Sequence, residues 1–266
     1  MRIAFPLLLF SLCFGALAGA QEKKVVFLGD PKPEEIRTAI AAAVEEAETQ
    51  AGFLGIEYQF VVARPEDAGE HDDATAVIIA ASPKEILAAA DALADAQVPV
   101  FNVSSDDDKL RTQCRPNLFH VPPSAKMLSD AEAQWRKAHP EAKSVEARAW
   151  HEGFVKFSAR ELNRRWEEAT GRPMTDEDWA IWAAYKLVSD AIANNPEADA
   201  EELLAYFHDE MEFDAVKGVF ATFRETGQLR QPLLIVAEGK LAGEAPVRGV
   251  ADTEDLDSLG GEQCQQ

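Results

Sequence analysis

Short apolar runs alternate along the first half of the chain with segments whose apolar residues recur every three or four positions. Five such runs occur, each five or six residues long: 24–28, 58–62, 76–80, 98–103 and 117–121. The segment after the first run places Ile36, Ile40, Val44 and Ala47 on one helical face. Continuous apolar strands that alternate with helices are typical of a parallel sheet covered on both faces. The pattern therefore predicts a doubly wound α/β lobe over residues 21–140.

The alternation stops near residue 140. Residues 141–148 are charged and rich in alanine, and we expect no strand there. The chain is then helical and aromatic before it becomes strand-like, and 232–237 is expected to pair with 241–245 as a hairpin. An acidic tail follows. The pattern predicts that 141–266 is a mainly helical part with a C-terminal β hairpin.

The N-terminus has the features of a secretory signal peptide. Arg2 precedes an apolar core over 5–17, and small residues at 18–20 stand before Gln21. The apolar core is too short to span a membrane, and no later segment is apolar for long enough. We expect residues 1–20 to be removed on export, and we expect no direct membrane insertion.

The charge balance narrows the classes of partner. The chain has 47 acidic and 26 basic residues, which gives a net charge of −21. Strong acidity argues against binding to nucleic acid or to anionic membranes. Keeping an exported protein in solution is a sufficient reason for this charge.

Two cysteines, Cys114 and Cys264, remain after removal of the signal peptide. Disulfides persist in the compartments that exported proteins reach. A bond between these cysteines would fasten the C-terminus to the turn after Ser105, and free thiols are the alternative. Neither the cysteines nor the five histidines have the spacing of a zinc site, so we expect no metal.

Serines follow two neighbouring strands of the predicted sheet. Ser82 comes after the third strand, and Ser104 and Ser105 come after the fourth. Ligands bind at the carboxyl ends of the strands in open parallel sheets, where hydroxyls and backbone N–H groups can hold a small anion. Serines after strands also cap the helices that follow. Ligand binding and helix capping are the two interpretations of these residues.

Arg111 and the pair Trp150–His151 are further candidates for ligand binding. Arg111 has the geometry to hold a carboxylate with two hydrogen bonds, or to pair with the aspartates at 106–108. An indole beside an imidazole can stack on a flat ligand, and a core tryptophan beside a surface histidine is the alternative. The sequence contains no G-x-S-x-G, H-E-x-x-H, phosphate-loop or G-x-G-x-x-G motif, so we expect neither enzymatic activity nor a cofactor.

Ten segments or single residues carry a resemblance to a known family. They are 114–120, 123–124, 127–128, 150–151, 171–174, 178–179, 182, 228–232, 256–260 and Cys264. Together they resemble the type I periplasmic solute-binding proteins of ABC importers for branched-chain amino acids and amides. The most similar branch is associated with quinoprotein alcohol dehydrogenase systems that use pyrroloquinoline quinone (PQQ).

The resemblance implies a periplasmic-binding-protein-like I fold, in which two lobes close on a small ligand and present it to a permease. Ser82, Ser104 and Ser105 match the turns that bind the polar head of the ligand in this family. The resemblance also supports a bond between Cys114 and Cys264. Because the strands of a second lobe are not evident, we expect one Rossmann-like lobe and a truncated second part.

The expected function is therefore a non-enzymatic, periplasmic binding component of an ABC transport system linked to quinoprotein alcohol oxidation. Its ligand would be small and carboxylated or quinone-like, such as PQQ or an amino acid, and its protein partner a permease or a periplasmic quinoprotein or cytochrome. The alternative is an accessory protein that binds a dehydrogenase or permease and no ligand. An exposed patch of Trp150, Trp166 and Trp179, with no pocket at the serine turns, would indicate the accessory protein.

Overall fold

The computed structural model describes residues 22–265, so the predicted signal peptide lies outside the described residues. Five parallel strands form the larger sheet, in the order β2-β1-β3-β4-β5. They are β1 (Glu22–Gly29), β2 (Glu57–Ala63), β3 (Ala76–Ala80), β4 (Val100–Asn102) and β5 (Leu118–His120). All five predicted strands are present, and the α/β fold class is confirmed.

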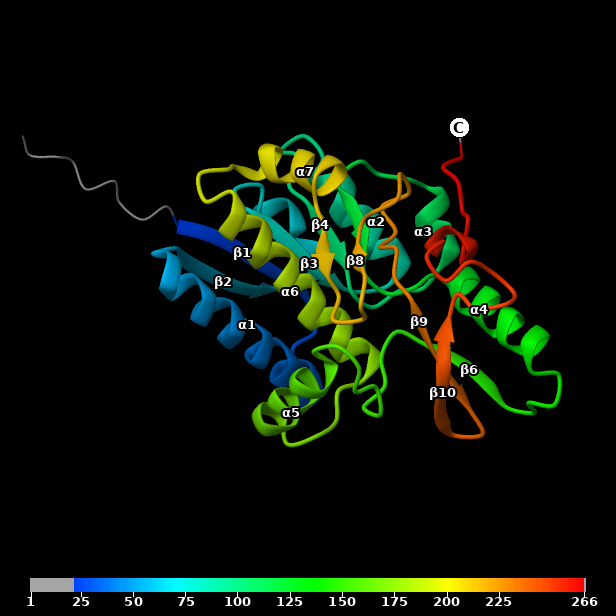
Figure 1. Ribbon diagram of the computed structural model, residues 1–266. Coiled ribbons are helices and arrows are strands. Elements are labelled where there is room, and N and C mark those ends of the chain that lie inside the picture. The colour runs from blue at the N-terminus through cyan, green and yellow to red at the C-terminus, as the bar shows by residue number, and fades with distance from the viewer. Residues whose placement is uncertain (1–21, 266) are drawn as a thin grey trace, which may run out of the picture.

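Helices cover both faces of this sheet (Figure 1). They are α1 (Glu34–Leu54), α5 (Ala159–Thr170), α6 (Asp176–Asn194) and α7 (Ala200–Asp209) on one face, and η1 (Pro65–Glu70), α2 (Pro83–Ala92) and the short α3 (Asp108–Thr112) on the other. Strand β1 shows why two layers are needed, because Val25 and Phe27 pack in one core and Val26 and Leu28 in the other. Continuous apolar strands therefore become a sheet buried on both sides.

Three of these helices come from the segment after residue 140. The longest, α6, is buried on nearly all sides because it lies between the sheet, α1 and α7. Its N-terminus is capped by Thr175 and Asp178, which form a reciprocal capping box. Much of the predicted helical part thus completes the lobe of the parallel sheet.

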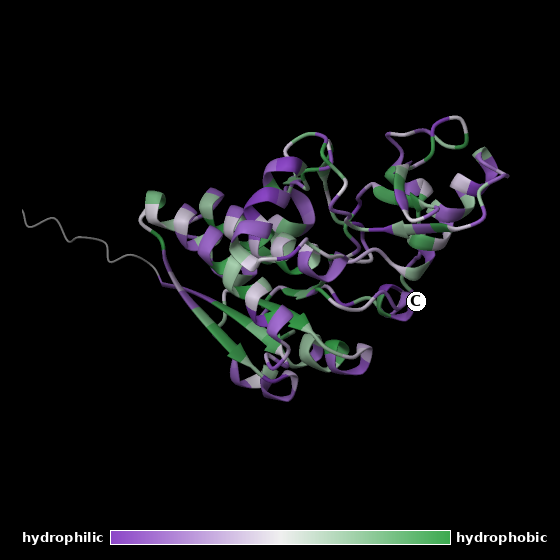
Figure 2. Ribbon diagram, turned by 90° about the horizontal axis from the view of Figure 1, so that it is seen from below, coloured by the Kyte–Doolittle hydropathy of each residue, from purple (hydrophilic) through white to green (hydrophobic). Residues whose placement is uncertain are grey.

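A second sheet lies beside this lobe, and Figure 2 shows it set apart from the larger body. Its three antiparallel strands have the order β10-β9-β6, and α4 (Ala125–Ala138) packs on one face. The strands are β6 (Val145–Arg148), β9 (Leu233–Ala237) and β10 (Lys240–Ala245). The hairpin of β9 and β10 confirms the prediction. Two short strands, β7 (Phe213–Asp214) and β8 (Phe220–Ala221), pair separately.

The expectation of no strand at 141–148 is wrong. Strand β6 buries Val145 and Ala147 in the core beneath α4 and exposes Glu146. Two inward residues are too few to reveal a strand in the sequence. The strand forms because its backbone pairs with β9, whose residues are almost entirely buried.

The C-terminal segment crosses from the second sheet back to the larger lobe. After η2 (Leu256–Ser258), Leu259 is buried in the core beneath α4. Cys264 is bonded to Cys114, with 5.5 Å between the two Cα atoms, which confirms the disulfide. The acidic tail is therefore fixed at both bodies of the molecule.

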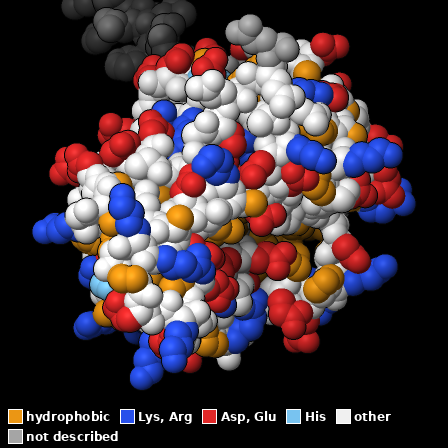
Figure 3. Space-filling view, turned by 90° about the vertical axis from the view of Figure 1, so that its right-hand side faces the viewer, with side chains coloured by type: hydrophobic (Ala, Val, Ile, Leu, Met, Phe, Trp, Pro, Cys, Tyr) orange, Lys and Arg blue, Asp and Glu red, His pale blue; other side chains and the backbone are white. Residues whose placement is uncertain are grey.

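The surface mixes both signs of charge. Figure 3 shows acidic and basic side chains intermingled on one face, with hydrophobic side chains in small separate groups. Among residues 22–265, no helix is long and apolar enough to cross a membrane.

Candidate functional site

A cavity of about 430 Å³ lies where the ends of the parallel strands meet the second sheet. Its lining comes from the turns after β4 and β5, from α4 and β6, and from the first turns of α6: Val103, Ser104, Asp106, Pro122, Pro123, Leu128, Glu146, Ala147, Arg148, Ala149, Asp176, Glu177 and Ala180. We call this cavity the cleft. Its volume lies in the range of small-molecule sites, and it lies at the edge of the sheet that the sequence indicates.

The turn after β4 is organised by Asn102, which is completely buried. Its Oδ1 atom accepts hydrogen bonds from the backbone N–H groups of Ser104 (3.1 Å) and Ser105 (2.9 Å), and its Nδ2 donates to the Ser105 carbonyl (2.7 Å). The two N–H groups expected to hold an anion are therefore already paired. Sequence reasoning missed Asn102, although an asparagine at the end of a buried strand often makes such local bonds.

The three predicted serines have different surroundings. Only Ser104 lines the cleft, where its hydroxyl accepts from the N–H of Ala81 (3.0 Å) and donates to the Ala81 carbonyl (3.2 Å). Ser105 accepts from the N–H of Asp107 (3.3 Å). Ser82 begins α2, and its N–H and hydroxyl both donate to Glu85. Ser82 is thus a helix cap, and Ser104 joins the ends of β3 and β4.

Arg111 is buried beneath the turns and does not line the cleft. Its guanidinium donates to the carbonyl of Ser105 (2.9 Å), to that of Pro122 (3.0 Å) and to Oε1 of Gln228 (2.9 Å). Burial lowers its pKa to about 10. In this geometry Arg111 braces the turns after β4 and β5, and its hydrogen bonds do not go to the neighbouring aspartate side chains.

Trp150 and His151 lie behind the wall of the cleft. Trp150 is buried, stacks on Trp179 with 6.2 Å between ring centroids, and donates from Nε1 to Asn163 (2.9 Å). His151 accepts from the N–H of Gly153 (2.9 Å). The adjacent Ala149 lines the cavity, whereas neither ring does. The packing is that of a core tryptophan.

The charges in the cleft are mostly negative. Four carboxylates line it, from Asp106, Glu146, Asp176 and Glu177, against the single base Arg148. Arg148 is already paired with Glu146 through two bonds of 3.0 Å. The cleft therefore presents a negative potential to any ligand, a property that the sequence did not reveal because these residues come from separate elements.

Asp176 is the least exposed of the four acids of the cleft. Burial raises its pKa, although the N–H of Trp150 donates to its Oδ1 at 2.7 Å and Arg148 and Lys217 attract its charge. Lys217 lies deeper, with its ammonium 3.8 Å from the ring centre of Trp179 and 2.7 Å from Oε1 of Gln231. Burial lowers the pKa of Lys217 to about 7.

Among residues 22–265, no group of three or more His, Cys, Asp and Glu side chains is arranged to hold a metal ion. The comparisons with known sequences find no match, either to a family model or to a curated protein.

Several solved structures share this fold at low sequence identity. A periplasmic binding protein from Burkholderia mallei has a TM-score of 0.68 at 9% identity, over 90% of this chain and 98% of that chain. A solute-binding protein of an ABC transporter from Rhodopseudomonas palustris BisB5, in complex with 3,4-dihydroxybenzoic acid, has a TM-score of 0.68 at 10% identity, over 84% and 94%. A leucine-binding protein from Thermotoga maritima MSB8 has 0.63 at 12%, over 84% and 97%. These similarities show a periplasmic-binding-protein-like I fold.

Proposed function

We propose that this chain is a periplasmic solute-binding protein that delivers a small ligand to an ABC permease, and that the cleft holds the ligand. The observation that carries the proposal is a cavity at the strand ends, lined by the parallel lobe on one side and by β6 and α4 on the other. Similar folds include proteins described as binding leucine and an aromatic acid, which supports a ligand of this size. The second sheet with α4 serves as a reduced second lobe.

The charge of the cleft distinguishes between the ligands that the family resemblance implies. PQQ carries three carboxylates, which would face four acidic side chains and an arginine already paired with Glu146. An amino acid brings an ammonium group, which the carboxylates attract. We therefore propose an amino acid as the ligand, with its ammonium group toward Asp176.

The remaining candidate residues take supporting roles in this proposal. Ser82, Ser105 and Arg111 hold the turns that shape the cleft, and Trp150 with His151 supports its rear wall. A link to quinoprotein alcohol oxidation, or to a quinoprotein or cytochrome partner, rests on the sequence resemblance alone and is secondary to the binding function.

Calorimetric titration of the mature protein tests the ligand class. The panel contains leucine, 4-methylpentanoate, which lacks the ammonium group, isoamylamine, which lacks the carboxylate, and PQQ. We expect leucine or a related amino acid to bind, and Asp176→Asn to weaken that binding about tenfold. Asp72→Asn, an exposed aspartate before β3 at the opposite end of the sheet, is the matched control. The function is rejected when no member of the panel binds, and a preference for PQQ over leucine would overturn the ligand class.

The alternative accessory-protein function lacks its expected signature. Trp150, Trp166 and Trp179 are all buried, and a cavity is present at the serine turns. A different surface favours a protein partner, because Phe157 and Phe220 are 63% and 68% exposed. If this function is right, the doubly substituted variant Phe157→Ser, Phe220→Ser loses a partner while ligand titrations of the wild type stay flat.

A further inference from the structure

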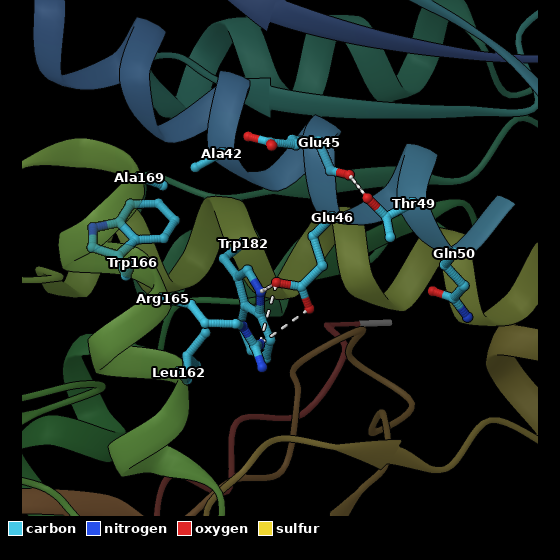
Figure 4. A pocket seen from close by; sticks show the side chains of 10 residues that line it. All are labelled: Ala42, Glu45, Glu46, Thr49, Gln50, Leu162, Arg165, Trp166, Ala169 and Trp182. Atoms are coloured by element: carbon cyan, nitrogen blue, oxygen red, sulfur yellow. Dashed lines mark hydrogen bonds and ion pairs between the residues drawn. The ribbon is translucent and has the colours of Figure 1, made fainter. Parts of the chain in front are cut away.

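A second concave site lies on the side of the larger lobe, away from the cleft. It is a groove of about 470 Å³ between α1 and α5, and it shares no lining residue with the cleft. Helix α1 contributes Ala42, Glu45, Glu46, Thr49 and Gln50, α5 contributes Leu162, Arg165, Trp166 and Ala169, and Trp182 of α6 lies below them (Figure 4). On each helix these residues recur every three or four positions, so one face of α1 forms one wall of the site and one face of α5 forms the facing wall. We call this site the α1–α5 groove.

Small residues on both walls create the space. Ala42 and Ala169 stand where α1 and α5 face each other, and neither side chain is long enough to fill the gap. The deeper surface is formed by Leu162 and by the indoles of Trp166 and Trp182, which are otherwise buried. The groove is therefore an open gap with an apolar floor, which a small ligand can fill.

The two glutamates at the rim of the groove differ in whether their charge is paired. Glu46 is already occupied, because it accepts from Nε1 of Trp182 (3.2 Å) and lies 3.4 Å from the guanidinium of Arg165 (Figure 4). Glu45 is exposed, and among the described residues its carboxylate makes no hydrogen bond or ion pair. The groove thus combines an apolar, aromatic floor with one uncompensated negative charge.

We propose that the α1–α5 groove is a second binding site, for a small apolar cation such as an aromatic amine. The ring of the ligand lies against the apolar floor of the groove, and its ammonium group faces Glu45. The lined walls extend over two helical turns, roughly 10 Å, which suits one ring and a short chain better than a partner helix. This site is independent of the function proposed for the cleft.

Titration with three matched probes tests the ligand class. Phenylethylamine, phenylacetamide and phenylacetate have similar size and carry a positive, no and a negative charge. We expect phenylethylamine to bind by calorimetry and to change tryptophan fluorescence, phenylacetamide to bind more weakly and phenylacetate not to bind. Equal binding of all three, or no binding of the amine, overturns the proposal.

Four variants locate the binding. Ala169→Phe fills the groove from the exposed side of α5, and Thr49→Phe fills it from the opposite wall if the first variant lowers stability. Either should weaken phenylethylamine binding about tenfold, and Glu45→Gln several-fold. Glu48→Gln, an exposed glutamate of α1 outside the groove, is the matched control and should change nothing.

The same measurements distinguish amine binding in the groove from amine binding in the cleft and from docking of a protein in the groove. If Asp176→Asn abolishes amine binding and the filling variants do not, the amine binds in the cleft and the proposal is wrong. If a basic amphipathic helical peptide binds, is blocked by Ala169→Phe and no small amine binds, the groove is a docking site for a protein and the proposed ligand class is wrong.

Discussion

The two sheets of this molecule differ in how much apolar structure covers them. The parallel sheet has helices on both faces, and its two cores contain most of the buried residues. The antiparallel sheet has α4 on one face, where nine buried residues form a small core, and on its other face Leu234 of β9 joins the core of the larger lobe. So small a core supplies little of the free energy that holds a separate unit together.

Polar contacts and the tail compensate for this small core. Arg224 donates to the carbonyls of Leu256 (2.8 Å) and Leu259 (2.6 Å), and the N–H of Gly260 donates to Asp130 on α4 (2.9 Å). The disulfide then joins the end of the same segment to the larger lobe. The larger lobe is therefore stabilised by its own core, whereas the second sheet depends on how the C-terminal segment is fastened.

The largest loss of stability is expected in the core of the larger lobe. Phe101 is fully buried, stacks on Phe119 with 5.3 Å between centroids and meets Phe207 edge-on at 4.9 Å. Phe101→Ala should lower the free energy of unfolding by about 3–5 kcal/mol, because it leaves a cavity beside the rings of Phe119 and Phe207. Denaturant unfolding measures this loss, and Phe53→Ala, at a phenylalanine 87% exposed, should change little. Equal losses would contradict the assignment of the core.

The same difference explains which elements the sequence could predict. The strand Ala76–Ala80 is almost completely buried, so its apolar run is visible without any partner. Strand β6 is four residues long and becomes a strand through pairing with β9, nearly ninety positions later. Local pattern is sufficient for the first kind of element, whereas the second depends on contacts distant in sequence.

The residues of the candidate site likewise fall into those that the sequence could predict and those that only the fold reveals. The serine turns were located because they follow recognisable strands, and Ser104 does line the cleft. Asp176 and Arg148 were missed because they belong to α6 and β6, which only the fold brings together. The burial of Arg111 was also hidden, since two of its acceptors are backbone carbonyls of the turns after β4 and β5, which any residue can supply.

An intermediate effect is expected from removal of the disulfide. The doubly substituted variant Cys114→Ser, Cys264→Ser frees the end of the tail, and loss of a bond across a sequence separation of 150 typically costs about 2–4 kcal/mol. Hydrogen exchange should increase first in residues 255–264 and in α4, and later in β3 and β4. Reduction of the wild type should have the same effect. Uniform acceleration across both sheets would show that the tail does not act on the second sheet in particular.

The smallest effect concerns Asp176, where the two regions meet at the cleft. Burial raises its pKa above the usual aspartate value, so the folded state binds the proton more tightly than the unfolded state does. Its contribution to stability is therefore fully present below the unfolded pKa and is lost as the pH rises through the raised, folded pKa. Asp176→Asn keeps an oxygen to accept from the N–H of Trp150 and should be slightly more stable than the wild type at pH 7, with the difference vanishing near pH 3. Denaturant unfolding at both pH values measures this, with Asp72→Asn as the control. If Asp176→Asn gains stability at pH 7 and loses ligand affinity, Asp176 is an acid retained for binding. If the variant loses stability at pH 7, Asp176 is instead a structural residue of the region where the two sheets meet.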